Sequence, residues 1–242
     1  MSSAAVVLAG GAGTRLHASE NKVYLPVAGR PLLAWSLETF DRSDHIDRIV
    51  LVIRDADADR ARDLLAAYPL RKLDTVVPGG VTRHESEHAG IEALAPAIET
   101  GNIDLVCVHD GARPFIRQSL IRAILQAAGR HGGAVPSLPL DAPVLVRASS
   151  GLEATPEPVP TDDLVRVQTP QAFRARELLH AHRRATADGL QGIDTATPVS
   201  RYTDLLVKAV EGDADNITVT FVEDLFAVEE LAMDWQRSGQ HG

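Results

Sequence analysis

Short apolar runs alternate with longer amphipathic stretches along this chain. Within each run the apolar residues follow one another directly instead of alternating with polar residues. Continuous apolar runs of this length are typical of strands in a parallel sheet that is buried on both faces. We therefore predict strands at residues 4–9, 49–53, 73–77, 103–108, 134–138, 205–210 and 217–221.

The stretches between these strands carry apolar residues at the spacing of one helix face. Strands that alternate with helices indicate the α/β class, in which helices cover a mostly parallel sheet. We expect a Rossmann-like α/β fold in a single domain that comprises residues 1–242. The predicted helices lie near residues 31–40, 56–68, 82–94, 119–130, 174–187 and 222–235.

The regular alternation breaks between Pro139 and Pro160, where prolines are crowded together. A segment so rich in proline cannot form a central strand. Two interpretations are open: a surface loop, or an extended arm that leaves the domain at about residues 139–162. In the second interpretation, residues 145–147 and 152–154 form the two sides of the arm.

The composition narrows the choice of partners and of location. Hydrophobic residues make up 45% of the chain, and the formal net charge of −9 argues against nucleic acid or an anionic membrane as a partner. The only cysteine, Cys107, lies in an apolar run, so we expect neither a disulfide nor a cysteine-based metal site. No segment has the pattern of a signal peptide or a membrane span, and the expected location is the cytoplasm.

A glycine-rich turn follows the first predicted strand. It consists of Ala9, Gly10, Gly11, Ala12, Gly13 and Thr14, and it is followed by Arg15 and Lys22. Glycines here let backbone N–H groups surround phosphate oxygens, and two nearby cations suit a triphosphate. The Gly-Lys-Ser/Thr of a Walker A loop is absent, and Leu16 stands where the dinucleotide fingerprint needs glycine or alanine. The alternative is a plain glycine turn with solvated charges.

A second polar cluster follows the predicted strand at residues 103–108. It reads His109-Asp110-Gly111-Ala112-Arg113-Pro114. Side chains at the carboxyl end of a parallel strand project into the crevice where α/β sheets bind ligands, and carboxylate oxygens suit Mg²⁺. Asp110 is therefore the first candidate for a metal ligand, with a capping role as the alternative. Arg113 either faces a substrate or supports the loop.

Several motifs together resemble those of the nucleotidyltransferase superfamily. They are the glycine turn with Arg15, residues 21–32, residues 109–114, Gly79-Gly80 with Arg83 and Ser86, residues 168–173 (Gln-Thr-Pro-Gln-Ala-Phe) and residues 215–220 (Asp-Asn-Ile-Thr-Val-Thr). Their order and spacing most resemble the 2-C-methyl-D-erythritol 4-phosphate cytidylyltransferases and relatives that act on ribitol 5-phosphate. The resemblance extends from about residue 6 to about residue 231. One such motif would be weak evidence, whereas this collinear series is strong.

This resemblance implies a cytidylyltransferase that joins CTP to a small sugar-alcohol phosphate and releases pyrophosphate. It implies that Arg15 and Lys22 neutralise the CTP phosphates and that Asp110 takes part in catalysis. It also implies a magnesium or other divalent ion at Asp110 and Asp215, although Asp215 equally reads as a turn residue. The residues expected to contact the cytidine, which otherwise form a simple turn before a helix, are Gly79, Gly80, Arg83 and Ser86.

The resemblance further implies a homodimer with two-fold symmetry, since this family uses a similarly placed arm to hold a second subunit. The arm segment contains large apolar residues that its prolines keep out of a central sheet. Leaving such a side chain in water costs about 1.5–3 kcal/mol. A partner surface is their expected destination: Leu140, Val144, Leu145, Val146 and Leu152.

The acceptor side departs from the family pattern at three places. Thr218 replaces a basic residue, residues 141–144 replace a segment that usually contains lysine, and Thr161 stands where an arginine is usual. Each lost charge-assisted hydrogen bond costs about 1–3 kcal/mol of binding free energy. The expected acceptor is therefore methylerythritol phosphate, with another polyol phosphate or a phosphonate as the alternative. A nucleotide-binding paralogue without catalysis is the alternative from another class. The residues expected to bind the acceptor are Arg113, Asp141, Arg166 and Thr218, with Arg147, Arg166 or Lys208 as replacement cations.

Four histidines are scattered over two of the predicted helices. Scattered histidines of this kind usually lie at the surface, and we interpret them in that way. They are His84, His88, His180 and His182.

Overall fold

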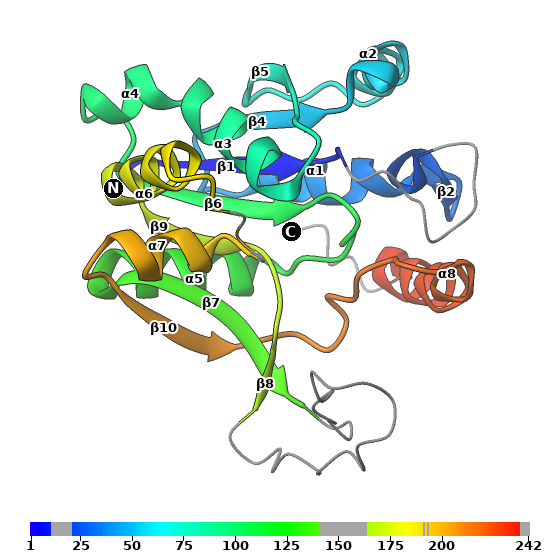
Figure 1. Cartoon of the computed structure of the whole chain (residues 1–242). Coiled ribbons are helices and arrows are strands. Elements are labelled where there is room, and N and C mark those ends of the chain that lie inside the picture. Colours follow the sequence, from blue (N-terminus) through cyan, green and yellow to red (C-terminus); the bar gives the residue numbers. More distant parts are fainter. Residues whose placement is uncertain (11–20, 141–163, 191, 193, 238–242) are drawn as a thin grey trace, which may run out of the picture.

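The computed structural model describes residues 1–10, 21–140, 164–190, 192 and 194–237. In this part of the chain, one mixed sheet of eight strands forms the centre of the molecule (Figure 1). Neighbouring strands are parallel from β6 to β5 and between β7 and β10, whereas β9 is antiparallel to both of its neighbours. The predicted mostly parallel α/β sheet is thereby confirmed. The eighth strand, β8 (Val165–Val167), pairs with β7 at the end of the sheet. The order of the other seven strands is β10 (Leu206–Glu211), β7 (Gly132–Pro139), β9 (Gln171–Arg174), β6 (Leu105–Asp110), β1 (Ser3–Leu8), β4 (Arg48–Ile53) and β5 (Leu73–Pro78).

Helices cover both faces of this sheet (Figure 1). One face packs against α1 (Leu32–Arg42), α2 (Ala58–Ala67), α5 (Gln118–His131) and α8 (Val222–Arg237). The other face packs against α3 (Arg83–Ala93), α4 (Ala95–Glu99), α6 (Ala175–Ala187) and α7 (Ala196–Tyr202). Two short 3₁₀ helices, η2 (Lys22–Tyr24) and η3 (Asp55–Asp57), and a small hairpin of β2 (Pro26–Val27) with β3 (Arg30–Pro31) complete the fold.

The central strand β1 shows why its sequence is continuously apolar. Ala5 and Val7 are buried in the core on one face, and Ala4 and Val6 are buried in the core on the other. A strand covered on both faces needs apolar side chains at successive positions. Helix α3 lies so close to this sheet that a Cβ atom on Gly90 would lie 2.4 Å from Cγ1 of Val6.

The expected elements agree with the observed ones to within a few residues, with one clear exception. Residues 217–221 form no strand. Their backbone donors pair elsewhere: Val219 N donates to Ala112 O, and Thr220 N and Phe221 N donate to the carboxylate of Asp224 at the start of α8. The sequence also failed to predict the short elements β8 (Val165–Val167), β9, α4 and α7, because each offers too few positions for a periodic pattern.

The chain enters and leaves the proline-rich segment along two paired strands. β8 runs antiparallel to the end of β7, with Pro139 opposite Val165 and Ser137 opposite Val167. Figure 1 shows this pair extending away from the rest of the sheet. The predicted sides of the arm, at residues 145–147 and 152–154, lie outside the described residues. None of the described helices is long and apolar enough to cross a lipid bilayer.

The interpretation of the histidines is wrong for two of the four. His84 is 3% exposed and His182 is 0% exposed, and their rings are stacked with centroids 5.0 Å apart. They are buried because α3 and α6 pack against each other on one face of the sheet. His180, in contrast, is exposed as expected, and His88 is half-buried.

Candidate active site

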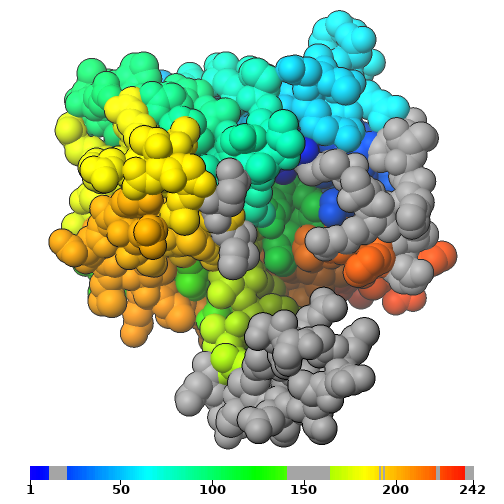
Figure 2. Space-filling view, viewed as in Figure 1, coloured from blue at the N-terminus to red at the C-terminus, as the bar shows by residue number. Residues whose placement is uncertain are grey.

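The candidate site lies at the carboxyl ends of β1 and β6. These strands are parallel neighbours, and Leu8 of β1 lies opposite Asp110 of β6. The next two strands of this sheet along the chain, β4 and β5, extend it to one side of β1, whereas β6 lies on the other side. A reversal of this kind leaves a crevice at the strand ends, which is the usual ligand site of open α/β sheets. In Figure 2, the green β6 region lies deep between α3 and the orange C-terminal segment.

Small residues line one side of this crevice, and Ser86 lies close to two of them. A Cβ atom on Gly10 would lie 3.5 Å from the Ser86 hydroxyl oxygen, and one on Gly79 would lie 2.8 Å from it. A Cβ atom on Gly80 would overlap Glu85, at 2.2 Å from its Cβ. The structure thus brings together four of the predicted nucleotide-binding residues, including Gly80. The other residues of the glycine turn, 11–14, and Arg15 lie outside the described residues.

Asn21 connects the segment of Lys22 to the end of β1 by a hydrogen bond. The buried Asn21 amide donates to the Ala9 carbonyl at 2.7 Å and to Oδ2 of Asp57 at 2.8 Å. Burial opposes ionisation of Asp57, but hydrogen bonds from Arg54 and Asn21 hold the pKa of that carboxyl below its usual value. Lys22 begins a 3₁₀ helix that Asn21 caps, and its ammonium donates to the Val219 carbonyl at 2.6 Å. The sequence motif singled out Lys22 but gave no role to Asn21 or Asp57.

Asp110 lies between two guanidinium groups. Arg83 Nη1 donates to its Oδ1 at 2.6 Å, and Arg113 Nε lies 3.8 Å from its Oδ2. Burial alone would raise the pKa of Asp110, but Arg83 and Arg113 outweigh it and hold the pKa below its usual value. The carboxylate is therefore ionised at neutral pH, and its side chain keeps 23% exposure toward the crevice.

Arg83 begins a helix, as the sequence suggests. Thr82 caps the amino end of α3 in a capping box with Glu85, so Arg83 occupies the first turn of the helix. Its guanidinium contacts Asp110 on β6 and Glu87 on its own helix. Arg83 therefore supports the Asp110 carboxylate, and direct contact with the cytidine stays a prediction.

The loop after β6 is held by residues of the Gln-Thr-Pro-Gln motif. The Thr169 hydroxyl accepts from the backbone N–H of Asp110 at 3.1 Å and lies 3.1 Å from Nδ1 of His109. Nε2 of His109 lies 3.0 Å from the Arg113 carbonyl. Burial lowers the pKa of His109 to about 4, so the ring is neutral and serves the loop as a hydrogen-bonding support. The motif was visible in the sequence, but its contact with the Asp110 backbone was not.

Arg113 both supports the loop and adds charge to the crevice. Its Nη1 donates to the Asn216 carbonyl at 2.7 Å, and its side chain keeps 12% exposure. Burial lowers the pKa of Arg113; the nearby positive charges of Arg83 and Arg166 act in the same direction, whereas Asp110 opposes them. Arg166, on β8, is thus near enough to Arg113 to add to one positive region.

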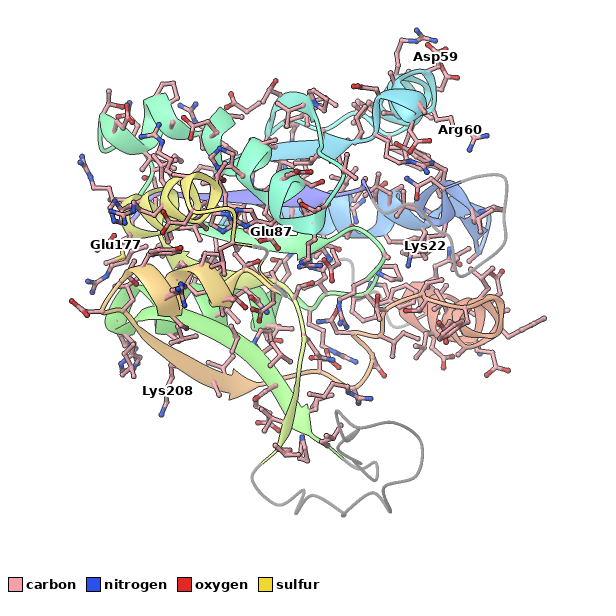
Figure 3. All side chains as sticks on the ribbon, viewed as in Figure 1. Lys22, Asp59, Arg60, Glu87, Glu177 and Lys208 are labelled. Atoms are coloured by element: carbon pink, nitrogen blue, oxygen red, sulfur yellow. The ribbon has the colours of Figure 1, made fainter. Side chains whose placement is uncertain are left out.

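The predicted replacement cations differ in where they lie. Arg166 lies on the exposed strand β8, and its positive charge acts on Arg113. Lys208 lies on β10, and Figure 3 places it far from Lys22. Arg147 and the predicted acceptor residue Asp141 lie outside the described residues. Thr218 belongs to the segment between Asn216 and Val219, which contacts Arg113 and Lys22 through its backbone.

Both predicted metal ligands form ion pairs in this structure. The carboxylate of Asp215 pairs with Arg117, which also binds Asp213 and lies over the Trp235 ring. The described residues contain no group of three or more histidine, cysteine or acidic side chains that could hold a metal ion. Mg²⁺ commonly binds one or two carboxylates together with substrate phosphates. Both carboxylates have arginine partners, Arg83 and Arg113 for Asp110 and Arg117 for Asp215. Asp110 fits that mode as a hard oxygen donor at the carboxyl end of β6.

Comparisons with known proteins give one family over nearly the whole chain. The family model for 2-C-methyl-D-erythritol 4-phosphate cytidylyltransferase matches residues 3–233. An enzyme of that name from Geobacillus kaustophilus is 36% identical over 227 residues, which cover 94% of this chain and 95% of that one.

Solved structures agree with this result. One is 4-diphosphocytidyl-2C-methyl-D-erythritol synthase from Anaerococcus prevotii, with a TM-score of 0.80 and 28% identity over 96% of both chains. Another is 2-C-methyl-D-erythritol 4-phosphate cytidylyltransferase from Thermus thermophilus, with a TM-score of 0.70 and 32% identity over 94% of this chain and 98% of that one. Since the family model matches nearly the whole chain and the Geobacillus kaustophilus enzyme is 36% identical over 94% of it, the chain belongs to the 2-C-methyl-D-erythritol 4-phosphate cytidylyltransferase family.

Proposed function

We propose that this chain transfers the cytidylyl group of CTP to the phosphate of 2-C-methyl-D-erythritol 4-phosphate, as a step in the biosynthesis of isoprenoid precursors. An oxygen of the acceptor phosphate attacks the α-phosphorus of CTP, and the bond from that phosphorus to the bridging oxygen of the β-phosphate breaks. The products are 4-diphosphocytidyl-2-C-methyl-D-erythritol and pyrophosphate. The observation that carries the proposal is the convergence of a glycine-lined edge, Lys22 and the Asp110 cluster at one switch point of the sheet.

The site residues have roles that follow from the charges of the reactants. The acceptor phosphate is already ionised and needs no strong base, so the barrier comes from bringing anions together and from the charge on departing pyrophosphate. Lys22 and Arg15 neutralise the CTP phosphates, and Arg113 with Arg166 binds the acceptor phosphate. Gly10, Gly79 and Gly80 leave room for the nucleotide. The Ser86 hydroxyl donates to the Thr82 carbonyl at 3.0 Å, so its oxygen is the atom that accepts a hydrogen bond from the nucleotide.

A divalent ion, for which Mg²⁺ is the natural candidate, completes this proposal. When bound, it neutralises phosphate charge and orients the α-phosphate for in-line attack. Asp110 would hold it together with the CTP phosphates. Asp215, which pairs with Arg117 as Asp110 pairs with Arg83, would be the second ligand.

The assembly and the location are also proposals. A single domain of residues 1–242 is supported by one sheet that contains strands from both ends of the chain. A homodimer through the arm is supported by the exposed Val165 and Val167 at its base, which are 52% and 38% exposed. A cytoplasmic location is consistent with a single buried cysteine, Cys107.

The experiment that tests the function is a screen for pyrophosphate release. All four nucleoside triphosphates are combined with methylerythritol phosphate, ribitol 5-phosphate, other polyol phosphates and a phosphonate, with Mg²⁺ present. Release with CTP and methylerythritol phosphate alone supports the proposal. Faster release with another acceptor contradicts the choice of substrate. CTP binding by calorimetry without release from any acceptor indicates the non-catalytic paralogue.

A further inference from the structure

A buried carboxylate, Glu87, lies directly behind Arg83 on α3. Its side chain is 1% exposed, and Figure 3 labels it below α3. Its Oε1 accepts from Arg83 Nε at 2.8 Å and from the Thr195 hydroxyl at 2.9 Å. Arg83 in turn donates through Nη1 to Asp110. A continuous chain of hydrogen bonds therefore runs from Thr195, at the start of α7, to the candidate metal ligand.

The Thr195 hydroxyl is directed to Glu87 and takes no part in capping its own helix. Thr195 is the N-cap residue of α7, a position where a threonine usually accepts from the backbone of the first turn, but its side chain makes no capping bond. The carboxylate of Asp194 accepts from the backbone N–H of Thr197 at 3.0 Å instead. Thr195 is fully buried, so water cannot serve as the partner of its hydroxyl. Among the described residues, the hydroxyl donates to Glu87.

A charged group at the Glu87 position lowers the stability of the fold. Its second oxygen lies 3.8 Å from Nε2 of His182, whose two ring nitrogens have no hydrogen-bond partner among the described residues. Burial raises the pKa of Glu87 to about 7, against the opposing effect of Arg83. Burial lowers the pKa of His182 to about 3, so the neighbouring ring is neutral and supplies no counter-charge. Burying an apolar side chain here would cost less free energy than burying a carboxylate. The Glu87 carboxylate therefore has a role other than packing.

The geometry of arginine explains what that role is. The guanidinium is planar, so a hydrogen bond at Nε fixes the direction in which both Nη atoms point. With Nε of Arg83 bound to Glu87, Nη1 points at Asp110. The Arg83 side chain is 33% exposed, and an Arg83 released from Glu87 can turn toward the anionic nucleotide and leave Asp110.

We propose that Glu87 is a positioning residue for cytidylyl transfer, which fixes Arg83 so that Arg83 holds the Asp110 carboxylate toward the bound nucleotide. Thr195 is the second positioning residue, since it orients Glu87. The inference rests on the proposed function, because it assigns Asp110 to the reaction. It predicts a loss of turnover with little loss of nucleotide affinity.

The test replaces each group by one of similar shape. Glu87→Gln removes the charge, and kcat is expected to fall about tenfold, which corresponds to about 1.4 kcal/mol. Thr195→Val removes only the hydroxyl, and kcat is expected to fall about threefold, whereas Thr195→Ser keeps the hydroxyl and restores kcat to nearly the parent value. In all three variants the Kd for CTP, measured by calorimetry with Mg²⁺, is expected to stay within about threefold of the parent value.

Glu92→Gln is the matched control, because Glu92 is also a glutamate on α3 that binds an arginine, Arg183, but on the exposed side. Its kcat is expected to equal that of the parent. The double variant Glu87→Gln/Thr195→Val is expected to have a kcat no lower than that of Glu87→Gln alone, since both changes interrupt the same series of hydrogen bonds.

The inference is overturned if Glu87→Gln keeps kcat within twofold of the Glu92→Gln control, or if Thr195→Ser loses as much as Thr195→Val. It is also overturned if the loss lies in CTP affinity. All variants are compared on the acceptor that the parent converts fastest. A parent that is inactive on methylerythritol phosphate but active on another acceptor thus contradicts the proposed substrate and leaves this comparison intact.

Discussion

Lys22 and Val219 are 197 residues apart in the chain, yet the Lys22 ammonium donates to the Val219 carbonyl at 2.6 Å. The same C-terminal segment binds Ala112 through the Val219 N–H and Arg113 through the Asn216 carbonyl. The loops after β1 and β6 are therefore joined by a third segment that crosses the carboxyl end of the sheet. Lys22 thereby lies beside the Asp110 loop.

The first prediction concerns CTP binding by Lys22. Lys22→Ala is expected to raise the Kd for CTP at least tenfold, or about 1.4 kcal/mol, because a cation beside the triphosphate is lost. Calorimetry with Mg²⁺ measures this affinity. Lys208→Ala is the matched control, since Lys208 lies on β10 away from the site (Figure 3). An affinity equal to that of the control would refute the role of Lys22.

A second prediction concerns Asp110. Asp110→Asn is expected to lower kcat by at least 100-fold, or about 2.7 kcal/mol, since a metal ligand and the charge between Arg83 and Arg113 are lost together. A strand-end position alone predicts an unchanged melting temperature. The two ion pairs change this expectation to a loss of a few degrees, because both guanidiniums lose their shared carboxylate.

Steady-state kinetics across Mg²⁺ concentrations and a thermal melt check the two parts of this prediction separately. Asp74→Asn removes a carboxylate from the exposed pair with Arg48 and serves as the control for both. Near-parent turnover of Asp110→Asn at every Mg²⁺ concentration would mean that Asp110 is structural.

The strands and the large helices were predictable from the sequence because burial on two faces leaves a clear apolar pattern. The site was predictable only in part. Glycines and isolated charges such as Lys22 and Asp110 stand out by residue type. Their supports do not, since Asn21, Glu87 and Thr195 are ordinary polar residues in the sequence. Only the fold brings Asn21 beside Ala9, and Thr195 beside the Glu87 that binds Arg83. The contact of Asp215 with Arg117 was also hidden, because it joins segments 98 residues apart.

A third prediction concerns the acceptor site. Arg166→Ala is expected to raise the KM for the acceptor about tenfold and to leave the KM for CTP unchanged, because one cation near Arg113 is lost. Arg174→Ala, which removes an exposed arginine that binds the Gly129 carbonyl, is the control. Equal KM values for both variants would exclude Arg166 from the acceptor site.

The fourth prediction follows from His182 and concerns stability. Its pKa of about 3 lies below the usual 6.5, so its contribution to stability is present above pH 6.5 and is lost as the pH falls. Between pH 7.5 and 5.5 this loss amounts to about 1.4 kcal/mol, or about 4 °C in Tm. His182→Phe is expected to remove that part of the pH dependence.

Thermal melts at the two pH values measure the effect. His180→Phe is the matched control, because that ring lies on the same helix but is exposed. A drop in Tm that is the same for His182→Phe and the parent would contradict a neutral, buried His182.

A fifth prediction concerns assembly. Deleting residues 144–156 and joining the ends by a short glycine-serine turn is expected to give a folded monomer with little or no transferase activity. The reason is that, in the proposed dimer, the arm would hold the second subunit near its acceptor site. Light scattering at micromolar concentration decides the matter: a monomeric parent, or a dimeric deletion variant, would be contrary to this expectation.

The burial of Cys107 in β6 has a practical consequence. The thiol is 0% exposed, and burial raises its pKa to about 12, so almost no reactive thiolate is present. Maleimides and iodoacetamides should therefore leave the folded native chain unmodified. A cysteine introduced at Val167 would be the single labelled position without any replacement of Cys107. With one spin label at that position, two copies of the chain in a complex would give a single distance between labels. That distance would measure how far apart the bases of the two arms lie.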